Sequence, residues 1–388
     1  MRRVLLVLNT GSSSIKFALH DARDHACIAR GAIEGIGRAP CLTLRNAQGV
    51  QSLHPREGAD DTAALIDWLL GTLASQLGPM DMVAAGHRVV HGGRDYSGPV
   101  VVSHSVMAKL QALCPWAPDH QPYNLAGIHA VARRWPNTVQ IACFDTAFHR
   151  TRPRVAQLFA LPRALSDEGI LRYGFHGLSY DHIAGRMLNV LGERVAQGKV
   201  IVAHLGSGAS LCAMQNAQSV DTTMGFTALD GLMMGTRCGQ IDPGVLLHLM
   251  RKKGLDADAL TRLLGRESGL LGVSGISPDM RELLASPAPE AAEAVTLFVH
   301  MIVRQIGALT AVLGGLDALV FTGGIGERSA VIRARVMVSL NWLGLIHDEG
   351  ANSAHKTLIS TPESSVVAAM IPTDEEGVIF RAMLTFSP

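Results

Sequence analysis

Two stretches of the chain share the same order of hydrophobic and polar positions. An apolar run, a tip of glycine and hydroxyl side chains and a second apolar run follow one another in residues 4–19 and again in residues 200–214. Each stretch predicts a β-hairpin with a tip of small residues. Aligning Gly11 with Gly206 also aligns the serines that follow them. Because the whole strand–turn–strand order recurs about half a chain length later, the pattern predicts two similar domains.

Further apolar patterns place helices between strands. Residues 139–144 and 318–321 have the composition of buried strands, and each is followed by a polar or glycine-rich turn. Apolar side chains at helical spacing predict a helix over 62–73, and residues 291–313 predict a long buried helix with few charges. In residues 371–384, Pro372 is followed by a threonine at the cap position and by acidic side chains, which are typical of a helix start. Strands interleaved with helices predict the α/β class.

Composition narrows the class of protein. The chain has 388 residues, of which 48% are hydrophobic and 17% are charged, so we expect no long disordered segment. This length predicts about two or three domains, and prolines and a polar turn place a boundary near residue 150. A net charge of +1 provides no basic excess, so we expect neither nucleic acid nor a membrane as a partner.

Cysteine spacing and the apolar stretches indicate the compartment. The six cysteines include no CxxC pair, and most lie in apolar runs, which is typical of reduced, buried thiols. The apolar run 4–8 is too short for a signal peptide. The apolar stretch 306–326 contains Asp317 and several glycines, which argues against a membrane span. We therefore expect a cytoplasmic protein.

Three loops of small residues follow predicted strands and are candidates for a phosphate site. They contain Gly11, then Gly206 and Gly208, and then the stretch 322–327. Small residues let backbone N–H groups approach phosphate oxygens, and Lys16 could add a charge beside the first loop. The absence of GxxxxGK[ST] excludes a P-loop, and no GxGxxG follows a strand. Each loop alone could be an ordinary turn, but the three together predict one nucleotide held between two domains.

Arginines and histidines beside glycine or proline are candidates for binding an anion. Arg88 lies in an apolar run and Arg237 lies close to glycines on both sides. Each is either half of a structural salt bridge or a clamp for carboxylate or phosphate. His120 and His176 are either ordinary turn residues or donors to a phosphoryl oxygen. No HExxH or other zinc spacing occurs in the sequence.

Two carboxylates, Asp145 and Glu375, follow apolar runs. Either could cap a helix, and either could handle Mg²⁺ through water if it lies beside the phosphate loops. Asp145 could also be a general base.

Together these segments resemble the acetate kinase family of the actin/Hsp70/sugar-kinase superfamily, over nearly the whole chain. The matching blocks are 9–16, 86–93, 117–124, 144–149, 173–177, 204–210, 224–243, 271–281, 323–327 and 372–376. The resemblance implies two ribonuclease-H-like domains with an active-site cleft between them. Residues 1–149, completed by a C-terminal helix at 372–388, would form one domain, and residues 150–371 would form the other, with the nucleotide site and dimer contacts. The resemblance also implies a homodimer and the reaction ATP + acetate ⇌ ADP + acetyl phosphate.

The resemblance further implies roles for the matching residues. Outside the nucleotide site, the metal ligands for Mg²⁺ (or Mn²⁺) would be Asn9 and Glu375, the substrate-binding residues Arg88 and His120, and the catalytic residues Asp145, His176 and Arg237. The nucleotide-binding residues would be Lys16, His204, Leu205, Gly206, Ser207, Gly208, Asp279, Met280, Arg281, Gly323, Gly324, Ile325, Gly326 and Glu327.

Four positions depart from the common family pattern. Ser207 and Asp374 stand where asparagine is usual, Asp119 stands where an apolar residue is usual, and Ala228 stands where proline is common. The last two positions leave open whether acetate, propionate or another short carboxylate is the acceptor. A superfamily member that hydrolyses ATP as a conformational switch is the alternative from another class, although a switch needs no carboxylate clamp.

Overall fold

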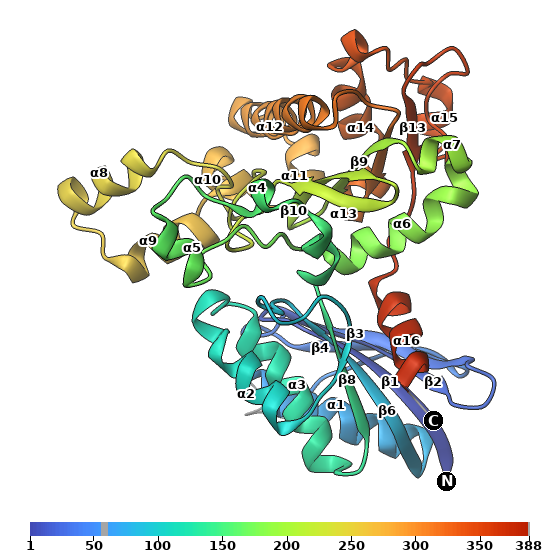
Figure 1. Cartoon of the computed structure of the whole chain (residues 1–388). Helices are drawn as coiled ribbons and strands as arrows, with labels where there is room; N and C mark the ends of the chain where they lie inside the picture. The colour runs from blue at the N-terminus through green and yellow to red at the C-terminus, as the bar shows by residue number, and fades with distance from the viewer. Residues whose placement is uncertain (56–60, 387–388) are drawn as a thin grey trace. The chain divides into compact units, whose positions relative to one another are not determined.

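The computed structural model of the chain describes residues 1–55 and 61–386. Its backbone contacts divide the chain into two units (Figure 1). Unit 1 comprises Met1–Phe148 and Asp374–Pro388, and unit 2 comprises His149–Thr373. The chain therefore forms unit 2 as one continuous segment and then returns to unit 1.

A mixed β-sheet forms the centre of unit 1. Its elements are β1 (Arg2–Thr10), β2 (Ser14–Asp21), β3 (Cys27–Glu34), β4 (Cys41–Asn46), β5 (Gly49–Leu53), α1 (Thr62–Leu77), β6 (Met80–Val89), β7 (Val100–Val101), α2 (His104–Ala112), the 3-10 helix Cys114–Trp116, α3 (Gln121–Arg134), β8 (Val139–Phe144) and α16 (Glu375–Phe386). The strand order is β5-β4-β3-β2-β1-β6-β8-β7. β1 pairs in parallel with β6, and β6 with β8, while β1 to β5 form an antiparallel meander. The first predicted hairpin is thereby confirmed as β1 and β2.

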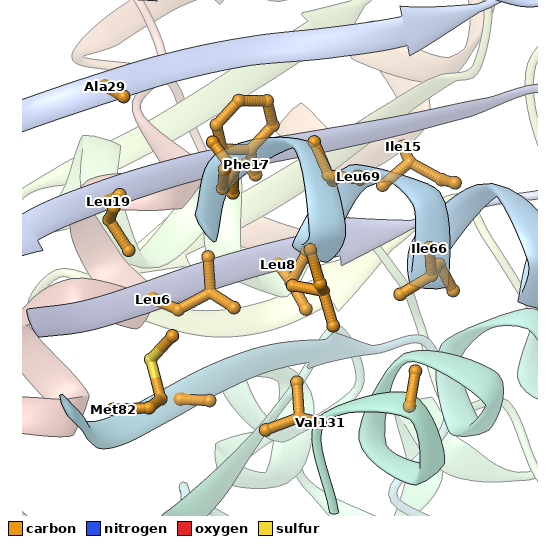
Figure 2. Close-up of a cluster of buried hydrophobic side chains, with 14 of the residues drawn as sticks. Leu6, Leu8, Ile15, Phe17, Leu19, Ala29, Ile66, Leu69, Met82 and Val131 are labelled. Atoms are coloured by element: carbon orange, nitrogen blue, oxygen red, sulfur yellow. The ribbon is translucent and has the colours of Figure 1, made fainter. Parts of the chain in front are cut away.

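One face of this sheet carries a large hydrophobic core (Figure 2). Leu6 and Leu8 of β1 belong to the same buried cluster as Ile66 and Leu69 of α1. Burying each such side chain contributes roughly 1.5–3 kcal/mol, which is why the helical spacing of apolar residues predicted α1 correctly. The helix begins where Asp61 accepts a hydrogen bond of 2.7 Å from the N–H three residues on.

The other face of the sheet packs against α16, which contacts β1, β6 and β8. Gly86 of β6 permits this approach, because a Cβ there would lie 2.5 Å from Ile379 and 2.7 Å from Met383. The predicted C-terminal helix is confirmed, but its cap differs from the expected threonine. Asp374 accepts a hydrogen bond of 2.9 Å from the Gly377 N–H, since a carboxylate at this position reaches the third helical N–H.

Unit 2 is built on a second, smaller sheet. Its elements are the 3-10 helix Ala147–Thr151 at the boundary, α4 (Arg154–Gln157), α5 (Arg163–Asp167), α6 (Gly177–Leu191), α7 (Glu193–Ala196), β9 (Lys199–Leu205), β10 (Ala209–Gln215), β11 (Gln218–Thr222), α8 (Pro243–Lys253), α9 (Ala257–Arg266), α10 (Gly269–Ser274), α11 (Met280–Ala285), α12 (Pro289–Leu313), β12 (Ala318–Thr322), α13 (Gly323–Arg328), α14 (Ala330–Val338), the 3-10 helix Asn341–Leu343, α15 (Glu349–Ser353) and β13 (Val367–Met370). The strand order is β11-β10-β9-β12-β13, with β9, β12 and β13 parallel. β9 and β10 form the second predicted hairpin, and the two sheets with their helices confirm the α/β class.

The predicted long helix is confirmed as α12. By length and composition it could cross a membrane, with a mean hydropathy of 1.6 over 18 residues. Buried side chains such as Phe298, Ile302 and Ile306 lie at helical spacing along it, and it contacts β9, β10 and β11. Such a face is also what the core helix of an α/β unit requires.

Residues 323–328 form a helix, α13, so the prediction of a turn there is wrong. Glycine is unfavourable inside helices, and α13 contains three of its six residues as glycine. Two charged side chains compensate at its ends. The Glu327 carboxylate accepts a hydrogen bond from the Gly323 N–H at 3.0 Å, and the buried Arg333 guanidinium donates to the Gly326 and Glu327 carbonyls.

The cysteines only partly follow the expectation of buried thiols. All six are free, but Cys143 and Cys212 alone are fully buried, and Cys27 is exposed. The first two lie in the central strands β8 and β10, whereas Cys27 begins β3.

Candidate active site

The carboxyl ends of three parallel strands in unit 1 bring four predicted residues together. Asn9 lies near the end of β1, Arg88 near the end of β6, and Asp145 directly after β8. Arg88 shares a face of its strand with Gly86, which packs on α16. Glu375, the first residue of α16, therefore lies on the same side of the sheet.

Arg88 is the centre of this cluster. Its Nη2 lies 2.6 Å from Asp145 Oδ2, and its Nε donates to both carboxylate oxygens at 3.1 and 3.2 Å. Its Nη1 donates to Asn9 Oδ1 at 3.3 Å, and its Nε is 4.0 Å from Glu375 Oε2. The salt bridge that the sequence left as one alternative is thus present.

Neighbouring carboxylates stabilise the positive charge of Arg88. The Asp145 side chain is 2% exposed and that of Arg88 is 21% exposed, so the pair is largely shielded from solvent. Burial opposes the positive charge, but the carboxylates of Asp145 and Glu375 outweigh it and raise the pKa of Arg88. The group is a permanent cation at the strand ends.

The donors around Arg88 match the chemistry of a hard divalent cation. Asn9 and Glu375 supply amide and carboxylate oxygens, which Mg²⁺ and Mn²⁺ prefer. Within residues 1–55 and 61–386, no three His, Cys, Asp or Glu side chains gather as a metal cage. Because Mg²⁺ is commonly held by one or two carboxylates, substrate phosphates and water, this sparse set fits it.

Two further predicted residues of unit 1 lie near the strand ends. Lys16 of β2 is the cross-strand partner of Asn9, so both side chains project from the same face of the hairpin. Lys16 is exposed. His120 directly precedes α3, at its N-cap position.

In unit 2, two predicted histidines stack on each other. The rings of His176 and His204 are 4.3 Å apart and inclined by 22°. His176 has a φ of 57°, a left-handed conformation that turns the chain into α6. Its Nδ1 is 2.9 Å from Ser210 Oγ, and Nδ1 of His204 is 2.8 Å from Ser179 Oγ.

Arg237 and His176 converge on the hairpin tip of unit 2. A Cβ on Gly208 would lie 3.0 Å from Arg237 Nη2 and 3.2 Å from His176 Nε2. Arg237 Nη1 donates to the Ala228 carbonyl at 2.6 Å, which fixes the guanidinium. A side chain at position 208 would therefore press against both groups, so glycine is required there.

The glycines of the tip and of α13 lie side by side. A Cβ on Gly206 would be 3.8 Å from the Gly324 nitrogen. Gly323 has a φ of 77°, and a Cβ there would be 2.8 Å from the Leu205 carbonyl oxygen. The predicted phosphate loops of unit 2 therefore form one continuous small-residue surface.

Some predicted nucleotide contacts have inward-facing side chains. Leu205 and Met280 are buried, so only their backbone can meet a ligand. The Glu327 carboxylate accepts from backbone N–H groups of its own unit. Asp279 caps α11, and its carboxylate binds the exposed Arg281 guanidinium at 2.5 Å.

Sequence reasoning missed the hydroxyl groups behind the histidines. Ser179 and Ser210 are fully buried, and the Tyr180 hydroxyl bonds Ser210 Oγ. Serine in a helix or strand has no distinctive sequence signal. Ser210 lies in the second hairpin, but the alignment of the two hairpins sets it against Ile15, so it drew no attention to this serine.

Comparison with known proteins gives one consistent picture. The model of the acetokinase family matches residues 4–381. An acetate kinase from Rhodopseudomonas palustris (strain TIE-1) is 53% identical over 98% of this chain and 98% of its own. The crystal structure of Porphyromonas gingivalis acetate kinase is 36% identical, with a TM-score of 0.87 and 99% of both chains covered. A propionate kinase from Francisella tularensis subsp. tularensis SCHU S4 is 35% identical, with a TM-score of 0.90 and 98% of both chains covered.

Proposed function

The chain belongs to the acetokinase family, and from this premise we propose how its residues perform the reaction. It is an ATP-dependent kinase that transfers a phosphoryl group to acetate, giving acetyl phosphate and ADP. The observation that carries the residue assignment is the convergence of Arg237 and His176 on Gly208, beside a glycine surface that a phosphate can approach.

Arg88 would bind the acceptor carboxylate. Acetate is ionised near neutral pH and needs no base to become a nucleophile. The hydrogen bonds to Asp145 and Asn9 use the Nε–H, one Nη2–H and one Nη1–H of Arg88. One N–H on each Nη atom is left, and this pair matches the spacing of a carboxylate.

Asp145 would orient Arg88. Its buried carboxylate accepts three hydrogen bonds from the Arg88 guanidinium, which is a poor arrangement for removing a proton and a good one for fixing the guanidinium plane. We therefore assign it to positioning the clamp and the neighbouring metal waters, and not to general base catalysis.

Arg237 and His176 would stabilise the moving phosphoryl group. Transfer between two oxygens depends on position and on neutralising the equatorial oxygens. Two donors fixed around one glycine suit that task, and removing one should cost roughly a hundredfold in turnover. Lys16, the 204–208 tip, Asp279, Arg281 and α13 would hold the nucleotide, with His120 in the acceptor pocket.

Asn9 and Glu375 would hold Mg²⁺, with Mn²⁺ as the alternative ion. When bound, the ion would neutralise charge on the phosphates. The amide oxygen of Asn9 and the carboxylate of Glu375, which both lie around Arg88, are the kind of ligand that supports this assignment.

A homodimer in the cytoplasm is also proposed. α8 contains no buried residue, and its Val245, Leu247 and Met250 are exposed. A second copy would cover such a surface, and light scattering would show twice the 41.3 kDa of one chain. The free cysteines fit a reducing compartment.

The acceptor is tested by trapping acyl phosphate with hydroxylamine. We expect hydroxamate with ATP and acetate, and a smaller yield with propionate or butyrate. A larger yield with propionate would make the chain a propionate kinase, the activity of the Francisella tularensis neighbour. ATP consumption without any hydroxamate would indicate a hydrolysing switch and contradict the kinase assignment.

A further inference from the structure

Thr373 is the last residue of unit 2, and two of its groups bond to parts of the proposed nucleotide site. Its backbone N–H donates to Glu327 Oε1 at 3.0 Å, and its Oγ1 donates to Ser179 Oγ at 2.9 Å. Partners 46 and 194 positions away in the sequence are thereby joined at one residue. In the sequence, Thr373 stood out only as a possible helix cap within the matching block 372–376, and Asp374 takes the capping role.

The N–H bond of Thr373 reaches α13. The Glu327 oxygen that accepts it also accepts the Gly323 N–H at 3.0 Å. One oxygen of the Glu327 carboxylate therefore bonds both the first residue of α13 and Thr373, which follows β13. Since such a helix has little stability of its own, its position depends on these anchors.

The hydroxyl bond of Thr373 reaches His204. Ser179 is fully buried, accepts from Thr373 and lies 2.8 Å from His204 Nδ1. A serine hydroxyl that accepts from Thr373 has its own hydrogen left for Nδ1. In that arrangement the other nitrogen, Nε2, carries a hydrogen. Nε2 lies 3.9 Å from where a Cβ on Gly206 would be, so it faces the hairpin tip.

We propose that Thr373 is a positioning residue of the nucleotide site, which sets α13 through Glu327 and the ring of His204 through Ser179. The proposal rests on the proposed function, because it requires that the 204–208 tip and α13 bind the nucleotide. Thr373 itself touches no reacting atom. It acts by fixing the positions of α13 and of His204 in the 204–208 tip.

The test compares Thr373→Val with Thr373→Ser. Valine keeps the shape and the backbone N–H but removes the hydroxyl, whereas serine keeps the hydroxyl. We expect Thr373→Val to raise the dissociation constant of Mg-ADP, measured by calorimetry, about five- to tenfold, the effect of one lost hydrogen bond. Thr373→Ser should bind within about twofold of the unsubstituted protein. The KM for acetate should not change in either variant.

Three further variants make the result decisive. Ser179→Ala removes the next hydroxyl in the series of hydrogen bonds from Thr373 to His204. It should therefore weaken Mg-ADP binding as much as Thr373→Val does, and the double variant should bind no more weakly than either single variant. If Thr373→Val does not fold, Ser179→Ala carries the test alone. Thr310→Val is the matched control, because it removes another buried threonine hydroxyl, one that has no partner among the described residues.

The outcomes separate the two proposals. Unchanged Mg-ADP binding in Thr373→Val, an equal loss in Thr373→Ser, or an equal loss in Thr310→Val would overturn the positioning role. If the unsubstituted protein forms no hydroxamate or does not bind Mg-ADP, the proposed function itself fails.

Discussion

The Arg88–Asp145 pair is compatible both with a structural role and with the proposed acceptor-binding role of Arg88. Unpaired, a shielded guanidinium would be costly, so the fold supplies Asp145. The pairing uses one edge of the guanidinium and leaves the other for a ligand. The two readings of Arg88 that the sequence left open are therefore compatible.

Asp145→Asn should lower kcat at least about a hundredfold, because the clamp loses its orienting charge. It should also lower stability, since the shielded Arg88 charge remains. Acetyl phosphate formation and urea unfolding would measure the two effects. The control is Asp67→Asn, which breaks the exposed Arg133–Asp67 ion pair, 2.9 Å long, between α1 and α3. Full turnover in Asp145→Asn would remove Asp145 from the mechanism.

At the scale of elements, close packing decides where α16 places Glu375. The helix touches β6 at Gly86, where there is no room for a methyl group. The proposed metal ligand sits at the start of that helix, 4.0 Å from Arg88. A shift of the helix would therefore change the proposed metal site.

Gly86→Ala should push α16 away from β6. Its Cβ would lie 2.5 Å from Ile379, and such overpacking typically costs about 1–3 kcal/mol. We expect a lower unfolding midpoint and a higher Mg²⁺ concentration for half-maximal activity. Gly71→Ala in α1 is the control, because its Cβ would meet nothing within 4 Å and alanine favours a helix. If both variants need the same Mg²⁺ concentration, α16 does not set the metal site through this contact.

At the scale of the whole molecule, each unit buries a neutral histidine. In unit 1, His87 bonds Gln140 at 2.8 Å, and burial lowers its pKa to about 4. In unit 2, burial and the charge of Arg152 lower the pKa of His149 to about 3. Protonation therefore favours the unfolded chain, where the pKa is near 6.5.

The free energy of unfolding should decrease as the pH is lowered through a defined window. Each neutral, buried histidine contributes fully to the free energy of unfolding above pH 6.5. This contribution is lost as the pH falls toward 4 for His87 and toward 3 for His149. Between pH 7 and pH 5 we expect a loss of about 2 kcal/mol for each, measured by urea unfolding. His87→Gln should flatten this dependence, while His104→Gln, at an exposed position, should not. An equal slope in both variants would show that folding does not lower the pKa of His87.

The sequence by itself determined the α/β class, both hairpins, α1, α12 and the family. These features depend on local periodicity or on contiguous motifs, which a chain displays without folding. It did not determine that α13 is a helix or that Asp374 is the cap of α16. Only the tertiary structure joined Arg88 to Asp145 and Thr373 to Ser179 and Glu327, because partners brought together by strand order and packing leave no trace in the spacing of residues along the chain.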